Sequence, residues 1–290
     1  LLLEPNGNLL LYGSFWLAQG EARRGLARLR SNGALDPDFA PELHGTVVRA
    51  VARQPNGCLI VAGDFTAVGG TWRPHIARLE PDGSLDWGFQ PESGVVFGEI
   101  NALAVQSDGK IIVAGSGMAT WQSSNLVVLR LEPHGALDKD FVVTNGFAGQ
   151  VRATAVQPDG KILLGGSSGV FIHGSPVLLA RLNPDGTPDP SFTCPLQPNG
   201  GVSGLALQPD GRILVGGFLQ PGPGETGLGL VRLEPDGAFD PTFTSEVRLC
   251  SDCDVRTLVL EPTADQDAAL RIEHESAHVA IAAEAHMYKY

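Results

Sequence analysis

Hydrophobic and polar positions along the chain fall into short runs that end at turn residues. A brief apolar run follows each of a series of glycines, as in Leu59–Val61 after Gly57 and Ile162–Leu164 after Gly160. Short runs bounded by Gly, Pro, Asn and Asp are typical of β-strands, and a helical period is absent from these runs. The pattern predicts an all-β protein.

Two turn landmarks recur five times in phase. The first is a Gln-Pro-Asp-Gly type of turn, and its glycines are Gly7, Gly57, Gly109, Gly160 and Gly211. The second follows a strand of the Ala-Arg-Leu type, and its turns end in Gly33, Gly83, Gly135, Gly186 and Gly237. Both series have spacings of 50, 52, 51 and 51 residues. Self-similarity at this period indicates a tandem repeat.

Each landmark fits a three-residue hairpin loop, in which Pro presets φ and Gly takes the left-handed position. In the second repeat this loop places Leu79 opposite Leu85 and Arg78 opposite Asp86. The same count predicts one Arg–Asp pair in each repeat: Arg28–Asp36, Arg78–Asp86, Arg130–Asp138, Arg181–Asp189 and Arg232–Asp240. We interpret these pairs as structural, because catalysis seldom needs five copies and a charge inside a packed blade must be paired.

Two hairpins in each repeat make four strands. The sequence therefore predicts a β-propeller of about five four-stranded antiparallel blades. A solenoid of hairpins is the alternative, and we favour the propeller because each repeat carries four strands and no helix signal.

The propeller is expected to span residues 1–262. Its repeats cover 1–45, 46–98, 99–149, 150–200 and 201–254, and a further first strand follows at 255–262. Either that strand completes the first blade and closes a ring of five, or the chain is cut from a longer propeller. Both interpretations stay open at this point.

The repeat stops after Pro262, and the tail 263–290 is expected to be helical. Thr263–Gln266 fits a capping box, and no Gly or Pro follows, although Leu270–His274 alternates as a strand would. The tail contains an HExxH motif, whose His274 and His278 would share one face of a helix and bind Zn²⁺, with Glu275 as general base. Only twelve residues follow the motif, too few to build a protease site. We therefore favour adventitious metal binding or an ordinary polar helix face, and a truncated zinc hydrolase is the alternative. No cofactor is expected except zinc under that alternative.

The repeat resembles a known family. The segments AVQPDGKILLGG at Ala155–Gly166 and LARLNPDGTPDPSF at Leu179–Phe192 are similar to the delta-60 repeats, which are bacterial β-propeller repeats of unknown function. Trp87-Gly88 departs from the usual Pro-Asp or Pro-Ser pair. The resemblance implies an extracellular or cell-surface bacterial protein, often large and multi-domain, and it supplies no catalytic residues.

Charge and hydropathy narrow the range of partners. The net charge is −12 and no cluster of Lys and Arg stands out, so a nucleic-acid partner is not expected. No window of about eighteen apolar residues exists, so membrane insertion is not expected either. We expect a monomeric module that is part of a longer polypeptide, since the chain opens at Leu1 inside a repeat.

Strand direction places all the Gly turns on one face and the variable connections on the other, where we expect function. Aromatic residues occur in these connections and could grip a protein or a glycan, with capping of the local core as the alternative: Trp16, Trp72, Trp121 and Phe171. Cys250 and Cys253 form a CxxC that fits a disulfide in an oxidising compartment. Cys58 lies in a strand, where we expect it to pack in the core.

The sequence thus predicts a binding or scaffolding module rather than an enzyme. Its ligand would be a protein or a glycan held on the variable face. The truncated zinc hydrolase and a purely structural spacer are the alternatives.

Overall fold

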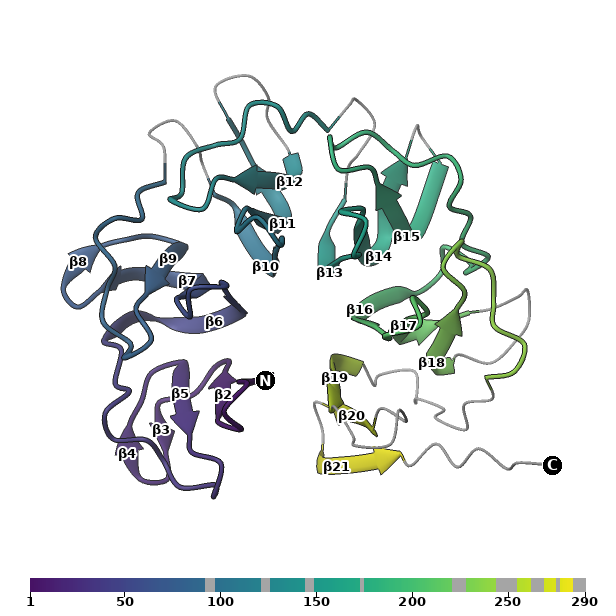
Figure 1. The fold of residues 1–290 in the computed structure, drawn as a ribbon. Helices are drawn as coiled ribbons and strands as arrows, with labels where there is room; N and C mark the ends of the chain where they lie inside the picture. Colours follow the sequence, from purple (N-terminus) through teal and green to yellow (C-terminus); the bar gives the residue numbers. More distant parts are fainter. Residues whose placement is uncertain are drawn as a thin grey trace. The chain divides into compact units, whose positions relative to one another are not determined.

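The computed structural model describes residues 1–91, 97–120, 126–143, 149–172, 175–220, 228–243, 255–261, 269–274 and 277–283. All regular structure in these residues is β-strand, and they contain no helix that could cross a membrane. The chain forms two compact units, Leu1–Val143 and Thr144–Tyr290. Each unit consists of small antiparallel sheets, which we call blades (Figure 1).

The first unit holds three blades. Blade one contains β1 (Leu2–Leu3), β2 (Leu9–Tyr12) and β5 (Leu26–Leu29), with a separate hairpin of β3 (Leu17–Ala18) and β4 (Glu21–Ala22). Blade two contains β6 (Leu43–Arg53), β7 (Leu59–Val68), β8 (Thr71–Trp72) and β9 (Ile76–Leu79). Blade three contains β10 (Glu99–Val105), β11 (Ile111–Met118) and β12 (Leu126–Leu131).

The second unit holds blades four and five and a further sheet. Blade four contains β13 (Val151–Val156), β14 (Ile162–Ile172) and β15 (Ser175–Leu182). Blade five contains β16 (Gly201–Leu207), β17 (Ile213–Leu219) and β18 (Leu228–Leu233). The β-pairing between these two blades consists of one residue pair, Ser167 with Gly201. The further sheet contains β19 (Val255–Glu261), β20 (Ala269–His274) and β21 (Ala277–Ala283).

The predicted register of the second hairpin is confirmed. The Glu80 N–H donates to the Ser84 carbonyl over 2.8 Å, and Leu79 forms a bridge with Leu85. The turn glycine Gly83 has a φ of 91°, as the left-handed loop position requires. The same bridge occurs in every repeat: Leu29↔Leu35, Leu79↔Leu85, Leu131↔Leu137, Leu182↔Pro188 and Leu233↔Phe239.

The fourth strand of each blade is shorter than the pattern suggested, because only one residue forms the bridge. The aspartate that follows the bridge residue ends the strand. The Asp86 carboxylate accepts the N–H of Gly88 over 2.6 Å, and the Asp138 carboxylate accepts the N–H of Asp140 over 3.0 Å. Such an Asx turn bends the chain away from its neighbour and stops the ladder.

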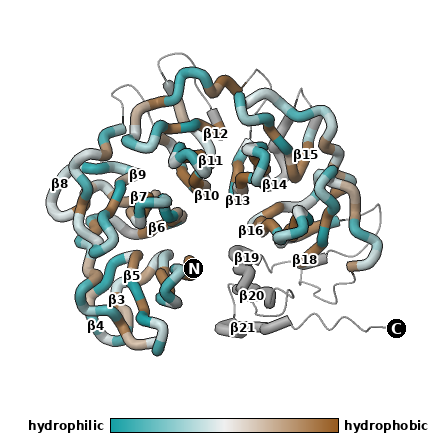
Figure 2. The backbone as a smooth tube through the Cα atoms, viewed as in Figure 1, coloured by the Kyte–Doolittle hydropathy of each residue, from teal (hydrophilic) through white to brown (hydrophobic). Residues whose placement is uncertain are grey.

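Hydrophobic side chains on the two faces of a blade pack against different neighbours. Leu59 and Val61 of β7 belong to a core shared with blade one, whereas Ile60 and Ala62 belong to a core shared with blade three. In Figure 2 the turns are mostly hydrophilic, while hydrophobic colour falls on the strands. A central strand of a blade is thus apolar on both faces, which explains its continuous apolar runs.

The predicted C-terminal helix is wrong. The described parts of the tail are the strands β20 and β21, and β20 pairs with β19 as the second strand of a blade pairs with the first. The alternation of apolar and polar residues over Leu270–His274 was therefore a better indicator of the structure than the absence of Gly and Pro. β19, for which two interpretations stood open, is the first strand of this last sheet.

This correction removes the geometric basis of the HExxH motif. His274 lies in β20 opposite Ala277 of β21, and His278 lies in β21, so the two histidines are on different strands of a hairpin. They do not share a helix face at a spacing of four residues. Their side chains, and Glu275, lie outside what the structure describes.

Candidate functional site

The predicted Arg–Asp partners lie together in each of the five repeats. In every case the guanidinium Nε donates to the aspartate Oδ2, and the distances are 2.8 Å for Arg28–Asp36, 2.6 Å for Arg78–Asp86 and 2.7 Å for Arg130–Asp138, Arg181–Asp189 and Arg232–Asp240. The guanidinium also lies over a phenylalanine ring three residues after the aspartate. For Arg28 and Phe39 the distance to the ring centre is 4.4 Å, within the range of a cation–π contact.

The same arginine bonds to the neighbouring blade. The Arg28 Nη1 donates to the Pro81 carbonyl over 2.6 Å, and Arg78 donates to the Pro133 carbonyl in the same way. Within the second unit Arg181 donates to the Pro235 carbonyl. The three-residue group of Arg, Asp and Phe therefore links one repeat to the hairpin loop of the next, which is consistent with a structural role.

A second basic side chain joins the aspartate in four of the five repeats. The Lys110 Nζ lies 2.7 Å from Asp138 and 3.0 Å from Glu132. Lys161–Asp189 at 2.9 Å and Arg212–Asp240 at 3.4 Å are the equivalent contacts in blades four and five. In blade one the second cation comes from another repeat position, as Arg30–Asp36 at 3.0 Å, because Asn8 follows the turn glycine there. Each of these four aspartates is thus shared by two cations.

These contacts stabilise the charged aspartates. Burial raises the pKa of Asp138, but the hydrogen bonds from Lys110 and Arg130 outweigh it and hold that pKa below its usual range. Burial likewise opposes ionisation of Asp240, yet bonds from Thr242 and Arg232 lower its pKa to about 2. The paired carboxylates are therefore charged at neutral pH.

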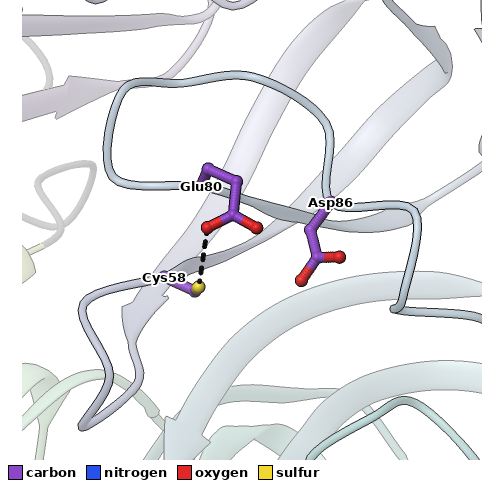
Figure 3. Close-up of side chains that lie close together, drawn as sticks. All are labelled: Cys58, Glu80 and Asp86. Carbon is purple, nitrogen blue, oxygen red and sulfur yellow. Dashed lines mark hydrogen bonds between the residues drawn. The ribbon is translucent and has the colours of Figure 1, made fainter.

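Blade two differs at this position. The residue after the first turn glycine is Lys110 in blade three and Cys58 in blade two, so a thiol stands where the ammonium would be. The Cys58 thiol donates to the Glu80 carboxylate over 3.4 Å, and Asp86 lies beside them (Figure 3). One sulfur and one oxygen from each carboxylate lie within 4.8 Å of one another.

The environment of Cys58 is buried and acidic. The residue is 4% exposed, and the Asp86 side chain is 14% exposed. Burial raises the pKa of the Cys58 thiol, and the nearby Glu80 and Asp86 carboxylates raise it further. The expectation that Cys58 is buried agrees with this placement, but sequence reasoning missed the two carboxylates around it. Aligning the residues that follow the five turn glycines would have shown that Asn8 and Cys58 stand where the other three repeats have Lys or Arg.

The structure describes the side chains of two of the four predicted aromatic residues, Trp16 and Trp72. Trp16 is 57% exposed beside β3, and Trp72 is 69% exposed in β8. Trp121 and the side chain of Phe171 lie outside what the structure describes. Phe171 itself belongs to β14, where it pairs with Pro176 rather than lying in an irregular loop.

A third exposed tryptophan, Trp87, was not among the predicted site residues. It is 63% exposed and lies next to the Asp86 turn, with Arg73 over its ring at 5.8 Å. The unusual Trp87-Gly88 pair, which replaces the Pro-Asp or Pro-Ser of other repeats, is the signal in the sequence that points to it.

Trp87 lines an open groove of about 490 Å³ along blade two. Its walls carry the carboxylates of Asp38, Glu42 and Asp82, and the tip of the hairpin between β7 and β8 closes one side. All three carboxylate residues are exposed. The groove therefore combines an exposed indole with negative charge, and we call it the Trp87 groove.

The Trp87 groove is lined from both of the faces that we predicted, the face of the Gly turns and the face of the variable connections. Its lining includes Gly69 and Thr71, from a connection that we assigned to the variable face, and Asp82 and Gly83, from a turn of the opposite face. The β7–β8 hairpin thus reaches the second hairpin turn. In blade one the β3–β4 hairpin does the same, since the Gln19 Nε2 donates to the Gly33 carbonyl over 2.8 Å.

The remaining cysteines are only partly described. Cys194 is a free thiol, and burial raises its pKa to about 11. Cys250 and Cys253 lie outside the described residues, so the predicted disulfide stays a prediction.

Solved structures that are similar to this chain include two described as enzymes and one surface protein. A gluconolactonase from Xanthomonas campestris is 17% identical with a TM-score of 0.53, and the match covers 93% of this chain and 84% of that one. A putative glucose dehydrogenase from Thermus thermophilus is 16% identical with a TM-score of 0.49, covering 90% and 91%. PorZ, a bacterial surface component of the type-IX secretion system of Porphyromonas gingivalis, is 10% identical with a TM-score of 0.49, covering 93% and 38%.

The expectation that this chain is not an enzyme must be corrected. It rested on the fold, and the gluconolactonase shows that the same fold carries catalysis. At this level of identity the similarity shows the fold alone, and no substrate or reaction transfers to this chain.

A family model matches the repeats directly. None of the curated proteins matches the sequence. The model for a domain of unknown function, the DUF5122 β-propeller, matches residues 4–39, 54–89, 106–141, 157–192 and 208–243. These segments are the five repeats found from the turn landmarks, and together they make up more than half of the chain. The chain belongs to the DUF5122 β-propeller family.

Proposed function

We propose that this protein is a binding module of a bacterial extracellular or cell-surface protein, and that it holds a protein partner in the Trp87 groove. The observation that carries this proposal is the Trp87 groove itself, with an indole that is 63% exposed between three exposed carboxylates. Trp and Arg are enriched at the energetic centres of protein interfaces, and Arg73 lies beside Trp87. The proposed extracellular or cell-surface location of the protein rests on the resemblance of its repeats to the delta-60 repeats.

The charge of the groove specifies the partner further. Glu42 and Asp82 carry negative charge, Asp38 is paired with Arg30 at 3.1 Å, and the whole chain has a net charge of −12. A segment that presents Lys or Arg next to an apolar side chain would match both the carboxylates and the indole. An acidic segment would be repelled.

A peptide array tests the proposal. We expect the purified chain to select Lys- or Arg-containing segments, and the affinity to fall at least about tenfold in Trp87→Ala, which corresponds to a contact of about 1.4 kcal/mol. Asp82→Asn is expected to weaken binding less, and added salt should reduce the difference between Asp82→Asn and the unmodified chain.

Trp16→Ala is the matched control, because Trp16 is similarly exposed at 57% and also has an arginine, Arg24, over its ring. Binding that is lost equally in Trp16→Ala and Trp87→Ala would contradict the assignment of the groove. Selection from a parallel glycan array, with no peptide selected, would replace the protein partner by a carbohydrate. Absence of binding on both arrays would favour a structural spacer.

A further inference from the structure

Blade two has two carboxylates and one cation where the other blades supply two cations. The aspartates of blades one, three, four and five each have two basic partners: Arg28 and Arg30, Arg130 and Lys110, Arg181 and Lys161, Arg232 and Arg212. Within the described part of the chain, Arg78 is the one basic side chain in a salt bridge with Asp86. Glu80 adds a second carboxylate at the same place.

The geometry of blade three shows where the second cation belongs. The Asp138 Oδ2 accepts both the Arg130 Nε and the Lys110 Nζ at 2.7 Å, and the Lys110 Nζ also contacts Glu132. A single positive centre is thus held between the two carboxylates while the arginine stays in place. Asp86 and Glu80 are the residues of blade two that correspond to Asp138 and Glu132 by repeat position.

In blade two a sulfur ligand faces this position. Cys58 is 4% exposed, and its Sγ lies 3.4 Å from the Glu80 Oε2. Zinc bonds of about 2.3 Å to sulfur and 2.0 Å to oxygen at a tetrahedral angle separate the two ligand atoms by about 3.5 Å. The ligand oxygen of Asp86 lies within 4.8 Å of the ligand atoms of Cys58 and Glu80. Rotation about the three side-chain torsions of Glu80 can bring its carboxylate closer to a bound metal.

We propose that Cys58, Glu80 and Asp86 bind a soft divalent cation of the Zn²⁺ type, which takes the place of the lysine ammonium of blade three. A thiolate, two carboxylates, the Arg78 guanidinium and a divalent metal sum to zero net charge, so binding neutralises the acidic cluster. Three protein ligands leave a fourth position for water. Ca²⁺ and Mg²⁺ should bind poorly, because they prefer sets of oxygen ligands.

Cobalt titration of the full chain tests this site. A chelator-treated chain is titrated with Co²⁺, and we expect one equivalent to produce the charge-transfer absorbance of a Co²⁺–thiolate bond, which Zn²⁺ then abolishes by displacement. The background carries Cys194→Ser, Cys250→Ser, Cys253→Ser and His274→Ala, so that Cys58 supplies the only thiol. Mg²⁺ in excess should leave the Co²⁺ signal unchanged.

Cys58→Lys is the decisive variant, because it restores the residue found in blades three and four. It should fold with the same β-sheet circular dichroism and lose the Co²⁺ signal. If it does not fold, Cys58→Ala in the same background replaces it. Glu80→Gln is expected to weaken Zn²⁺ binding at least about tenfold while keeping the thiolate band.

The proposal is overturned if the background chain shows no thiolate band with Co²⁺. It is also overturned if the band survives in Cys58→Ala or if Glu80→Gln leaves the affinity for Zn²⁺ unchanged. As a separate readout, Zn²⁺ should raise the melting temperature of the background chain and leave that of the folded Cys58 variant unchanged.

Discussion

Blades two and three share one architecture and differ in how they hold charge. Both have an Arg–Asp pair at 2.6–2.7 Å and a phenylalanine under the guanidinium. Blade three adds the Lys110 ammonium between Asp138 and Glu132, whereas blade two places the Cys58 thiol beside Asp86 and Glu80. The difference teaches that one substitution, at the residue after the first turn glycine, is enough to turn a salt-bridge site into a candidate metal site.

Removing the phenylalanine ring should destabilise the chain more than any of the other changes, and to a similar extent in blades two and three. Phe89 is completely buried and Phe141 is 8% exposed. Phe89→Ala and Phe141→Ala should each lower the free energy of unfolding by about 3–5 kcal/mol, because a buried ring leaves a cavity. Urea denaturation measures both. A loss below about 1 kcal/mol in either variant would show that the ring is not part of a common core.

Removing the aspartate should lower the free energy of unfolding more in blade three than in blade two. Asp138→Ala leaves the cations of Arg130 and Lys110 without their shared carboxylate, and we expect a loss of about 3 kcal/mol in urea denaturation. Asp86→Ala leaves only Arg78 and relieves the repulsion from Glu80, so its loss should be about 1 kcal/mol in metal-free buffer. Equal losses would mean that the second cation contributes nothing.

Replacing Lys110, which follows the first turn glycine of blade three, by cysteine should give blade three the charge pattern of blade two. In metal-free buffer Lys110→Cys should destabilise the chain by about 1 kcal/mol, because it removes two charged hydrogen bonds of a partly exposed side chain. The same variant should gain a second Co²⁺–thiolate site, since Glu132 and Asp138 remain in place. A Lys110→Cys variant that binds no additional Co²⁺ would show that blade two has some further feature that its thiol and carboxylates do not explain.

Acid should weaken the blades that hold two cations. The pKa of Asp240 is about 2 in the folded chain and about 3.9 in an unfolded one. The stabilisation is therefore present above about pH 4 and is lost as the pH falls towards about 2. Denaturation midpoints of the unmodified chain and of Asp240→Asn should converge over this window. A difference that persists to about pH 2 would contradict the assignment.

Much of the fold follows from the sequence because two turns repeat in phase. Counting outward from Gly83 gives the pairing of Leu79 with Leu85 and of Arg78 with Asp86, since a three-residue loop fixes the register. The length of the fourth strand does not follow in the same way. It depends on whether the aspartate carboxylate bonds to the backbone two residues later, as Asp86 does to Gly88.

The candidate sites follow from the sequence less completely. The Trp87 groove depends on the β7–β8 hairpin reaching the Asp82 turn, and no repeated pattern specifies how a variable connection folds. The Cys58 cluster needs the register between two hairpins of one blade, whereas our count treated each hairpin alone. The prediction for the tail was wrong because a capping box and the absence of Gly and Pro favour a helix, whereas the pairing of β20 with β19 favours strands.

The link from one repeat to the next has an evolutionary consequence. Arg28, Arg78 and Arg181 reach the neighbouring repeat through the backbone carbonyls of Pro81, Pro133 and Pro235. A main-chain oxygen is present whatever side chain the neighbour carries, so a duplicated or exchanged copy is joined by the same bond as soon as it is translated in frame. Genes of this kind are therefore able to gain copies by unequal recombination, and each new copy is free to diverge at its hairpins without loss of its connection.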